Sequence, residues 1–504
     1  MFFAGVVFLA WGLVRLGQAP HLSARDVLLD GGRACPAAPV RILEPAGFAP
    51  AVGSLIVFHG LSANRLIMLP LGEQLAAAGF RVYLVDSPGH GVNPAPFSFA
   101  ANEACAAGLL ERLEHTGEIT RGKTVLLGHS MGGGLVLRLA DYFPAAGTIS
   151  LSGAPIVRPH RLPENLLLIA PQFDIPDILV QERELSAAAG PERDSREDFR
   201  QARAFRLLRF PWQTHTSPIF SAPATRAMVR WALESVGATT RPVPPIDYRP
   251  FRGALLGLAG ILLMFPAALE VFARLAGLAA PTDGSRAAHP VAALLAWLAA
   301  GIFSAMVLVF WMPLARIHLF GGDYLGSFLL VAGLPLALAF AGNTARGALR
   351  PSASVTAMLM STILALATAA AIGAWSNWQL AELWPSAARL ARLPLLAGAM
   401  LPASFAEEAA LGPAPPLFTV KQAGRPILAL ALRGMLLLGM LGAFESGVGA
   451  ALLPVIFTLP LAGLSFGVRL GMDLVRRRTS SAAAAALFGA ILNAWFVAAA
   501  FPLA

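Results

Sequence analysis

The chain has 504 residues, of which 56% are hydrophobic and only 13% are charged. Its mean hydropathy of +0.64 excludes a wholly soluble enzyme and predicts several membrane-spanning helices. The formal net charge of +9 does not indicate nucleic-acid binding, because basic residues of membrane proteins gather in loops that face the cytoplasm and its anionic lipids. We therefore expect a lipid bilayer, and no nucleic acid, as a partner.

An apolar stretch at residues 2–14 opens the chain. No basic segment precedes it, and Pro20 directly follows the only apparent cleavage site, Gly17-Gln18-Ala19. We therefore favour an uncleaved anchor helix, within residues 1–20, over a signal peptide.

Residues 21–236 alternate between apolar runs of strand length and helical segments. Strands are expected at 38–47, 54–58, 81–85, 125–128, 147–151, 165–170 and 205–210. Helical segments are expected at 69–78, 99–116, 133–142, 178–204 and 221–236. Strand, helix and strand in this order predict a parallel sheet with right-handed crossovers.

The composition changes after this region. Residues 237–252 are rich in proline and predict a stiff linker. From 253 to 504 we expect a helical membrane domain of about eight spans, at 253–273, 291–313, 324–342, 354–375, 392–406, 427–445, 448–467 and 483–503. The fifth span is the weakest prediction, because it is short and contains Pro394 and Pro402.

Basic residues follow the seventh predicted span, at 469 and 476–478, so that loop should be cytoplasmic by the positive-inside rule. Counting back through eight spans places residues 21–236 outside the cytoplasm. Two observations oppose this: Arg249 and Arg252 lie next to the first span, and omitting the fifth span reverses the side. The extracytoplasmic location would permit a disulfide between Cys35 and Cys105, but two separate thiols fit the sequence equally well.

Ionisable residues also occur within predicted spans, where they are costly. We expect Arg433 to pair with Glu407, Glu408 or Glu445, and we favour a structural ion pair over a transport pathway.

The motif with the clearest chemistry is Gly128-His129-Ser130-Met131-Gly132, which follows an apolar run and precedes a helical segment. A G-x-S-x-G sequence in this position predicts a nucleophile elbow, a turn so tight that the residues two before and two after the serine must be small. The N-terminus of the following helix would favour a negative charge developing near Ser130.

Three motifs in order, FHGLSAN at 58–64, VDSPGHG at 85–91 and GHSMGGG at 128–134, resemble those of α/β-hydrolases of the serine esterase and monoacylglycerol-lipase-like group. The resemblance covers about residues 38–236. It implies an α/β class, with a mostly parallel sheet and a small or absent lid, followed here by an all-α polytopic membrane domain. Because this fold hosts many chemistries, the motifs say little about the substrate.

The resemblance also implies a triad in the order serine, acid, histidine. Ser130 would be the nucleophile, Asp174 the acid and His215 the general base. Asp174 could instead cap the helical segment that follows, in which case Asp177 is the reserve acid. The backbone N–H groups of Leu61 and Met131 would form the oxyanion hole.

Other polar residues of the three motifs are expected to be structural. His59 and His129 should bond local backbone, and Asp86 should cap a turn.

Only residues 153–164 separate two predicted strands where relatives insert a lid, so we expect a nearly open site. A lidless esterase attached to a bilayer suggests a lipid or acyl ester as substrate, whereas soluble esters or peptides are the alternative. No metal or organic cofactor is required, and protein partners are not predicted. The competing hypothesis is a membrane transporter or scaffold module with a regulatory hydrolase-fold domain.

Overall fold

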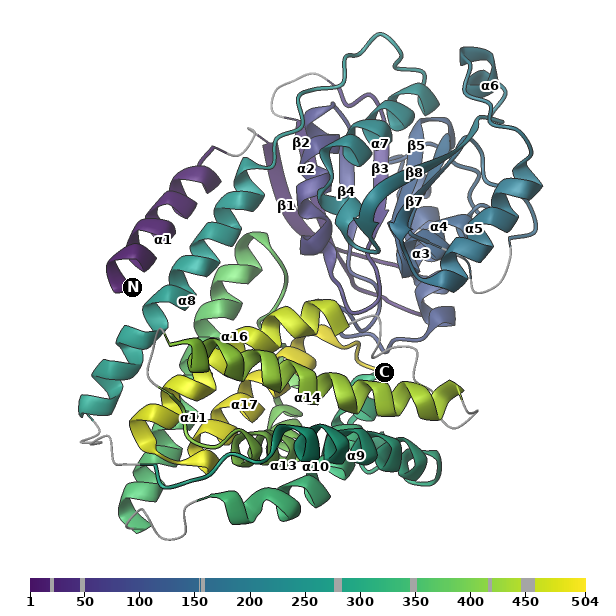
Figure 1. Ribbon diagram of the computed structural model, residues 1–504. Coiled ribbons are helices and arrows are strands. Elements are labelled where there is room, and N and C mark those ends of the chain that lie inside the picture. Colours follow the sequence, from purple (N-terminus) through teal and green to yellow (C-terminus); the bar gives the residue numbers. More distant parts are fainter. Residues whose placement is uncertain are drawn as a thin grey trace. The chain divides into compact units, whose positions relative to one another are not determined.

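The computed structural model describes residues 1–18, 22–45, 50–153, 155, 159–275, 283–344, 351–415, 419–445 and 458–504 (Figure 1). The chain divides into two compact units. The sheet unit comprises Ala10–Gly257, Trp375–Leu383 and Pro502–Ala504. The helical unit comprises Met1–Leu9, Leu258–Ala374 and Trp384–Phe501.

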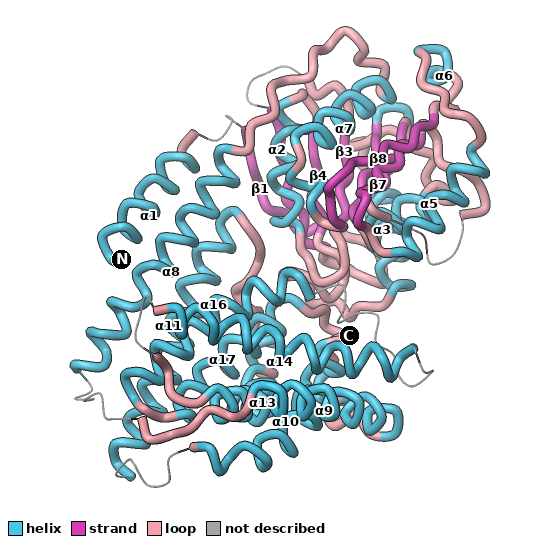
Figure 2. Tube along the Cα trace, viewed as in Figure 1, coloured by secondary structure: helices cyan, strands magenta, loops and turns pink. Residues whose placement is uncertain are grey.

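An eight-stranded sheet forms the centre of the sheet unit (Figure 2). The strand order is β1-β2-β4-β3-β5-β6-β7-β8; β2 is antiparallel to both of its neighbours, and the strands from β4 to β8 pair in parallel. This is the α/β-hydrolase fold, as expected. The strands are β1 Leu22–Leu29, β2 Ala38–Pro45, β3 Ser54–Phe58, β4 Arg81–Val85, β5 Thr124–His129, β6 Gly147–Leu151, β7 Leu166–Phe173 and β8 Phe205–Thr214.

Helices cover both faces of the sheet. Successive residues of a strand point to opposite faces, so Leu55 and Val57 pack with α2 and α7, whereas Ile56 and Phe58 pack with α3 and α4. Both faces are buried, which explains why the central strands are continuous apolar runs. The helices are α2 Leu69–Ala77, α3 Phe99–His115, α4 Met131–Leu139, α5 Pro176–Ala189, α6 Arg196–Arg200 and α7 Ala222–Ser235.

Several elements of the sheet unit differ from the expectation. Strand β1 was not predicted, because most of its residues are exposed and it lies at the sheet edge, where its Asp26 pairs with Arg41 of β2 at 2.7 Å. Strands β7 and β8 continue beyond their predicted ends. The predicted helical region 178–204 consists of α5 and the short α6.

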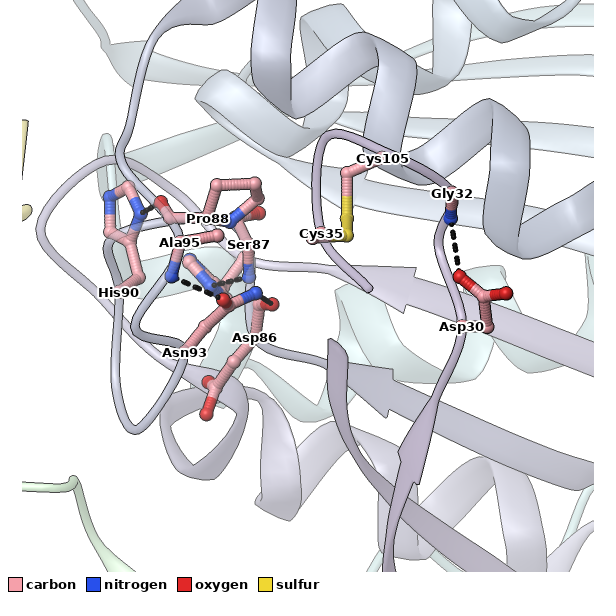
Figure 3. The surroundings of a disulfide bond; sticks show 11 residues. Asp30, Gly32, Cys35, Asp86, Ser87, Pro88, His90, Asn93, Ala95 and Cys105 are labelled. Atoms are coloured by element: carbon pink, nitrogen blue, oxygen red, sulfur yellow. Dashed lines mark hydrogen bonds between the residues drawn. A yellow bond between two sulfur atoms is a disulfide. The ribbon is translucent and has the colours of Figure 1, made fainter. Parts of the chain in front are cut away.

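The two cysteines are joined: a disulfide connects Cys35, just before β2, with Cys105 of α3 (Figure 3). Their Cα atoms are 5.4 Å apart, within the usual range for this bond. In the preceding turn, the backbone N–H of Gly32 donates to Asp30 Oδ1 at 2.8 Å (Figure 3). The disulfide therefore links the β1–β2 hairpin to α3, a helix that packs on one face of the sheet.

Helices dominate the rest of the chain. The helix bounds are α1 Phe2–Leu16, α8 Arg249–Leu275, α9 Pro290–Phe310, α10 Gly322–Phe340, α11 Pro351–Gln379, α12 Ala387–Leu390, α13 Leu393–Leu411, α14 Val420–Glu445, α16 Thr458–Thr479 and α17 Ala482–Ala500. Helix α1 contains the predicted apolar stretch. Its Gly12 lies against Gly253 and Gly257 of α8, where an added Cβ would come within 3.0 Å of backbone atoms. Such close contacts between small residues are typical of packed membrane helices.

The expected spans can be compared with the helices of the described residues. Six helices there are long and apolar enough to cross a membrane: Arg249–Leu275, Pro290–Phe310, Gly322–Asn343, Val355–Gln379, Gly424–Gly442 and Ala482–Ala500. The fifth predicted span is a helix, α13, but it contains Pro402, Glu407 and Glu408 and is not among the six. The seventh falls partly on residues 446–457, outside the described residues, and α16 after it carries several arginines.

A buried network of ion pairs explains why α13 and α16 are rich in charge. Arg469 of α16 contacts Glu407 at 3.0 Å and also pairs with Glu408 and, at 2.7 Å, with Asp473. Arg433 of α14 contacts Glu407 at 2.7 Å, which confirms a predicted pair; the side chain of Glu445 lies outside the described residues. Each charge of this network therefore has an opposite partner, as burial requires.

Candidate active site

Ser130 lies at the sharp turn between β5 and α4. Its φ of 54° is in the left-handed region, which is unusual for a non-glycine residue. A Cβ added to Gly128 would lie 2.0 Å from the carbonyl oxygen of Gly132, and one added to Gly132 would lie 2.3 Å from the carbonyl oxygen of Phe58. Only glycine fits at both positions, so the G-x-S-x-G spacing produces the tight turn for a steric reason.

Ser130, His215 and Asp174 form a continuous hydrogen-bonded chain. His215 Nδ1 lies 2.6 Å from Asp174 Oδ1, and His215 Nε2 lies 2.8 Å from Ser130 Oγ. Because a carboxylate can only accept, Nδ1 carries the proton and Nε2 is free to accept from the serine hydroxyl. The Asp174 side chain is fully buried and the His215 side chain is 14% exposed. The arrangement can therefore move a proton from Ser130 to a histidine held by a buried charge.

The elements that bring these residues together are the carboxyl ends of neighbouring strands. Asp174 directly follows β7, and His215 directly follows β8. The backbone N–H of Ile175 donates to Asp174 Oδ1 at 2.7 Å, but the cap position of α5 is Ile175, without a side-chain cap bond. Asp174 is thus not a helix cap, and Asp177 is an exposed residue of the first turn of α5.

The loop after β3 packs directly against the elbow. A Cβ added to Gly60 would lie 3.2 Å from Ser130 Cβ. The next residue is Leu61, so its backbone is close to the nucleophile. Met131 is the first residue of α4, where a backbone N–H has no acceptor within the helix. Leu61 and Met131 thus belong to the two backbone segments that meet at Ser130.

Two histidines near the elbow bond to backbone, as expected. The backbone N–H of Ser87 donates to His59 Nε2 at 3.1 Å, so His59 Nδ1 carries the proton that reaches Gly60 O at 2.7 Å. His129 Nε2 lies 3.0 Å from the carbonyl oxygen of His215. Burial, reinforced by the nearby His215 ring, lowers the pKa of His129 to about 3, so His129 stays neutral and supports the His215 backbone.

Asp86 has a buried cation as its partner. Its Oδ1 accepts from the backbone N–H of Arg65 at 2.7 Å, and its Oδ2 pairs with the Arg65 guanidinium. The same guanidinium lies 2.7 Å from Glu382, whose side chain is 5% exposed. Sequence reasoning missed Arg65 and Glu382, because no local pattern relates an arginine after the β3 loop to a residue after α11.

Two aromatic side chains are exposed close to the acid and the histidine in sequence. Phe173 is 52% exposed and Trp212 is 84% exposed, with ring centroids 6.1 Å apart. The pairing of β7 and β8 shifts register between Pro171 and Phe173, and Trp212 has a φ of 59°. The irregular strand ends thus direct two large apolar groups toward solvent, which is energetically unfavourable without a partner.

Comparisons with known proteins found similarity to part of the chain. Residues 49–204 match the model of a family described as serine aminopeptidase, S33. No curated protein matches the chain. Similar solved structures include an esterase/lipase from an uncultured bacterium, 16% identical over 47% of this chain and 91% of that one, with a TM-score of 0.34. A dienelactone hydrolase from Anabaena variabilis is 18% identical over 43% of this chain and 98% of that one, with a TM-score of 0.32.

Proposed function

We propose that the chain is a membrane-bound serine hydrolase that cleaves carboxylic esters through an acyl-enzyme. The observation that carries this proposal is His215, which contacts Ser130 at 2.8 Å with one ring nitrogen and Asp174 at 2.6 Å with the other. A histidine held in one tautomer by a buried carboxylate is the arrangement that activates a serine hydroxyl.

In the first half-reaction, Ser130 Oγ attacks the ester carbonyl carbon while His215 Nε2 takes the hydroxyl proton. The backbone N–H groups of Leu61 and Met131 stabilise the oxyanion, and the ester C–O bond breaks as His215 returns the proton to the leaving alcohol. Water then gives a proton to His215 and attacks the acyl carbon. The acid leaves and Ser130 regains its proton.

The substrate is proposed to be a lipid or another acyl ester. Six helices of the described chain are apolar enough to cross a membrane, which would keep the enzyme at a bilayer. The exposed rings of Phe173 and Trp212 border the residues proposed as acid and base, and they suit an apolar acyl chain better than a soluble polar ester.

A peptide substrate is the second candidate, favoured by the family description serine aminopeptidase for residues 49–204. The same Ser130, His215 and Asp174 chemistry would cleave an amide. A panel of acyl esters and aminoacyl amides with matched leaving groups separates the two candidates. Hydrolysis of the esters alone supports the first candidate, and hydrolysis of amides with a free N-terminus supports the second.

We also propose that the sheet unit lies outside the cytoplasm. The Cys35–Cys105 disulfide supports this side, because such bonds persist in oxidising compartments. In intact cells, a protease that cannot cross the membrane should digest the sheet unit only if the sheet unit lies outside the cytoplasm.

The test of the activity is labelling of the detergent-solubilised full chain by a fluorophosphonate probe. Labelling of the wild type that Ser130→Ala and His215→Ala both abolish supports the proposal. His160→Ala is the matched control, because the His160 side chain is 89% exposed and pairs only with Asp141 among the described residues. A folded wild type that takes no label refutes it.

A further inference from the structure

A cavity of about 350 Å³ opens on the sheet unit at a distance from the proposed triad. It is lined by residues of α6, α7, β7 and the edge strand β8. Its residues Leu167 and Arg206 are the second residues of β7 and β8, whereas Asp174 and His215 directly follow the ends of these strands. Since β7 has 8 residues, the cavity and the triad are roughly 20 Å apart along the strand. The proposed reaction therefore does not use this cavity.

Local geometry directs side chains of α7 and β8 to the cavity. On α7, Arg226, Arg230 and Glu234 are spaced four residues apart and so lie along one face of the helix. On β8, Arg206 and Leu208 are two residues apart and so share one face of the strand. The cavity is therefore the place where one helix face meets one strand face.

The buried part of the lining is apolar. Trp231 is 5% exposed and Phe199 is 9% exposed, and their rings pack edge to face with centroids 4.7 Å apart. The indole N–H of Trp231 donates to the carbonyl oxygen of Asn165 at 2.6 Å, so its donor is already used within the fold. This part of the lining suits the carbon atoms of a ligand rather than its charge.

The exposed part of the lining carries an excess of positive charge. Arg206 Nη2 pairs with Asp194 Oδ2 at 2.6 Å, which accounts for one arginine and one acid. Among the residues that the structure describes, the side chains of the other three arginines form no hydrogen bond and no ion pair. Four arginines and two acids leave a net charge of +2; they are Arg196, Arg206, Arg226, Arg230, Asp194 and Glu234.

Two of these arginines also repel each other. Arg226 and Arg230 are exposed and lie one helical turn apart on α7, where like charges are unfavourable. A convex surface would let such charges spread into solvent, but here they line the same concave site with an apolar interior. A bound anion would offset the repulsion, which the fold by itself leaves uncompensated.

We propose that this cavity binds the phosphate group of an organic phosphomonoester, either a soluble one or the headgroup of a lipid such as phosphatidic acid. Guanidinium groups bind phosphate through two parallel N–H···O bonds, and a phosphomonoester carries close to two negative charges, which match the net charge of the lining. The volume is in the range of small-molecule sites, and the apolar interior receives the carbon part of the ligand. The inference does not depend on the proposed function, because no triad residue lines the cavity.

Calorimetric titration of the detergent-solubilised full chain tests the site with two probes, glycerol phosphate and a short-chain phosphatidic acid. Salt near the physiological level screens non-specific attraction. At least one probe should bind saturably. Binding of glycerol phosphate supports a soluble ligand, and binding of the phosphatidic acid alone supports a lipid headgroup. Succinate, which is doubly charged but has no phosphate, should bind at least about ten-fold more weakly.

Variants of α7 connect the binding to this cavity. The double variant Arg226→Gln/Arg230→Gln should bind the same probe at least about ten-fold more weakly. Arg200→Gln is the matched control, because Arg200 is an exposed arginine of α6 that does not line the cavity. Without ligand, the double variant should melt no lower than the wild type, since it removes a repulsion.

Any one of four results would overturn the inference. These are no saturable binding of either phosphomonoester, binding of succinate as tight as that of the phosphomonoester, a double variant that binds like the wild type, and a ligand-free double variant with a lower melting temperature. The last result would show that the two arginines stabilise the fold instead of waiting for an anion.

Discussion

Arg65 and Glu382 form an ion pair of 2.7 Å inside the sheet unit, although one follows the β3 loop and the other follows α11. Asn64, in the same loop, also accepts a hydrogen bond from the backbone N–H of Glu382 at 3.2 Å. The segment Trp375–Leu383 is therefore a structural part of the sheet unit, which links the loop carrying the proposed oxyanion donor Leu61 to residues far along the chain.

Removing the Arg65 guanidinium should lower the stability of the fold. Arg65→Met leaves the buried carboxylate of Asp86 without its counter-charge, and the free energy of unfolding should fall by about 3–5 kcal/mol. Thermal unfolding in detergent measures the loss. Arg41→Met, which removes a partly exposed pair with Asp26, should change stability by no more than about 1 kcal/mol. Equal effects of the two variants would contradict the role of Arg65.

The same site predicts a dependence of stability on pH. Burial, followed by the repulsion from Asp86, raises the pKa of Glu382 from 4.5 to about 8. The folded state therefore binds this proton more tightly than the unfolded state, so the contribution of Glu382 to stability is full below pH 4.5 and decreases up to about pH 8. The melting temperature of Glu382→Gln, relative to wild type, should rise across that window and then level off. A difference that does not vary with pH would show that Glu382 is ionised throughout.

Loss of the disulfide should destabilise the sheet unit. Cys35 and Cys105 are separated by 70 positions, and the chain-entropy argument gives about 4 kcal/mol for a loop of that size. The double variant Cys35→Ser/Cys105→Ser should unfold at a lower denaturant concentration than the oxidised wild type. Reduced wild type should resemble the variant; a reducing agent without effect on the wild type would show that the bond does not form.

The elbow glycines should not tolerate a methyl group. Gly132→Ala places a Cβ within 2.3 Å of the Phe58 carbonyl oxygen, so strand β3 or the turn must move, at about 1–3 kcal/mol. Probe labelling of Ser130 should be lost. Gly122→Ala is the matched control, because nothing lies within 4 Å of its added Cβ. Normal labelling of Gly132→Ala would exclude a tight turn at Ser130.

Asp174 should be essential for the rate of ester cleavage but not for folding. Asp174→Asn keeps the shape of the side chain but can stabilise the wrong tautomer of His215, so kcat toward an ester should fall by about 10⁴. Asp177→Asn, at an exposed position of α5, should leave kcat unchanged. If Asp177→Asn reduced kcat and Asp174→Asn did not, Asp177 would be the acid.

Local sequence patterns were sufficient for much of the sheet unit. Strands β3, β4 and β6 begin and end at the predicted residues, and their buried side chains reflect a sheet that is covered on both faces. The turn at Ser130 was predictable because only glycines fit on either side of it. Strand β1 was not predictable, because most of its residues are exposed at the sheet edge and the strand forms only through pairing with β2.

The sequence by itself determined the α/β class, the elbow and the presence of apolar helices, since each depends on the chemistry of neighbouring residues. Tertiary structure alone decided three further points. It joined Cys35 to Cys105, for which spacing left two alternatives. It paired Arg469 of α16 with Glu407 and Glu408 of α13. It also placed Glu382 beside Arg65. The physical reason is the same in each case: a buried charge requires an opposite charge and a disulfide requires a second thiol, and either partner can come from any part of the chain that folding brings near.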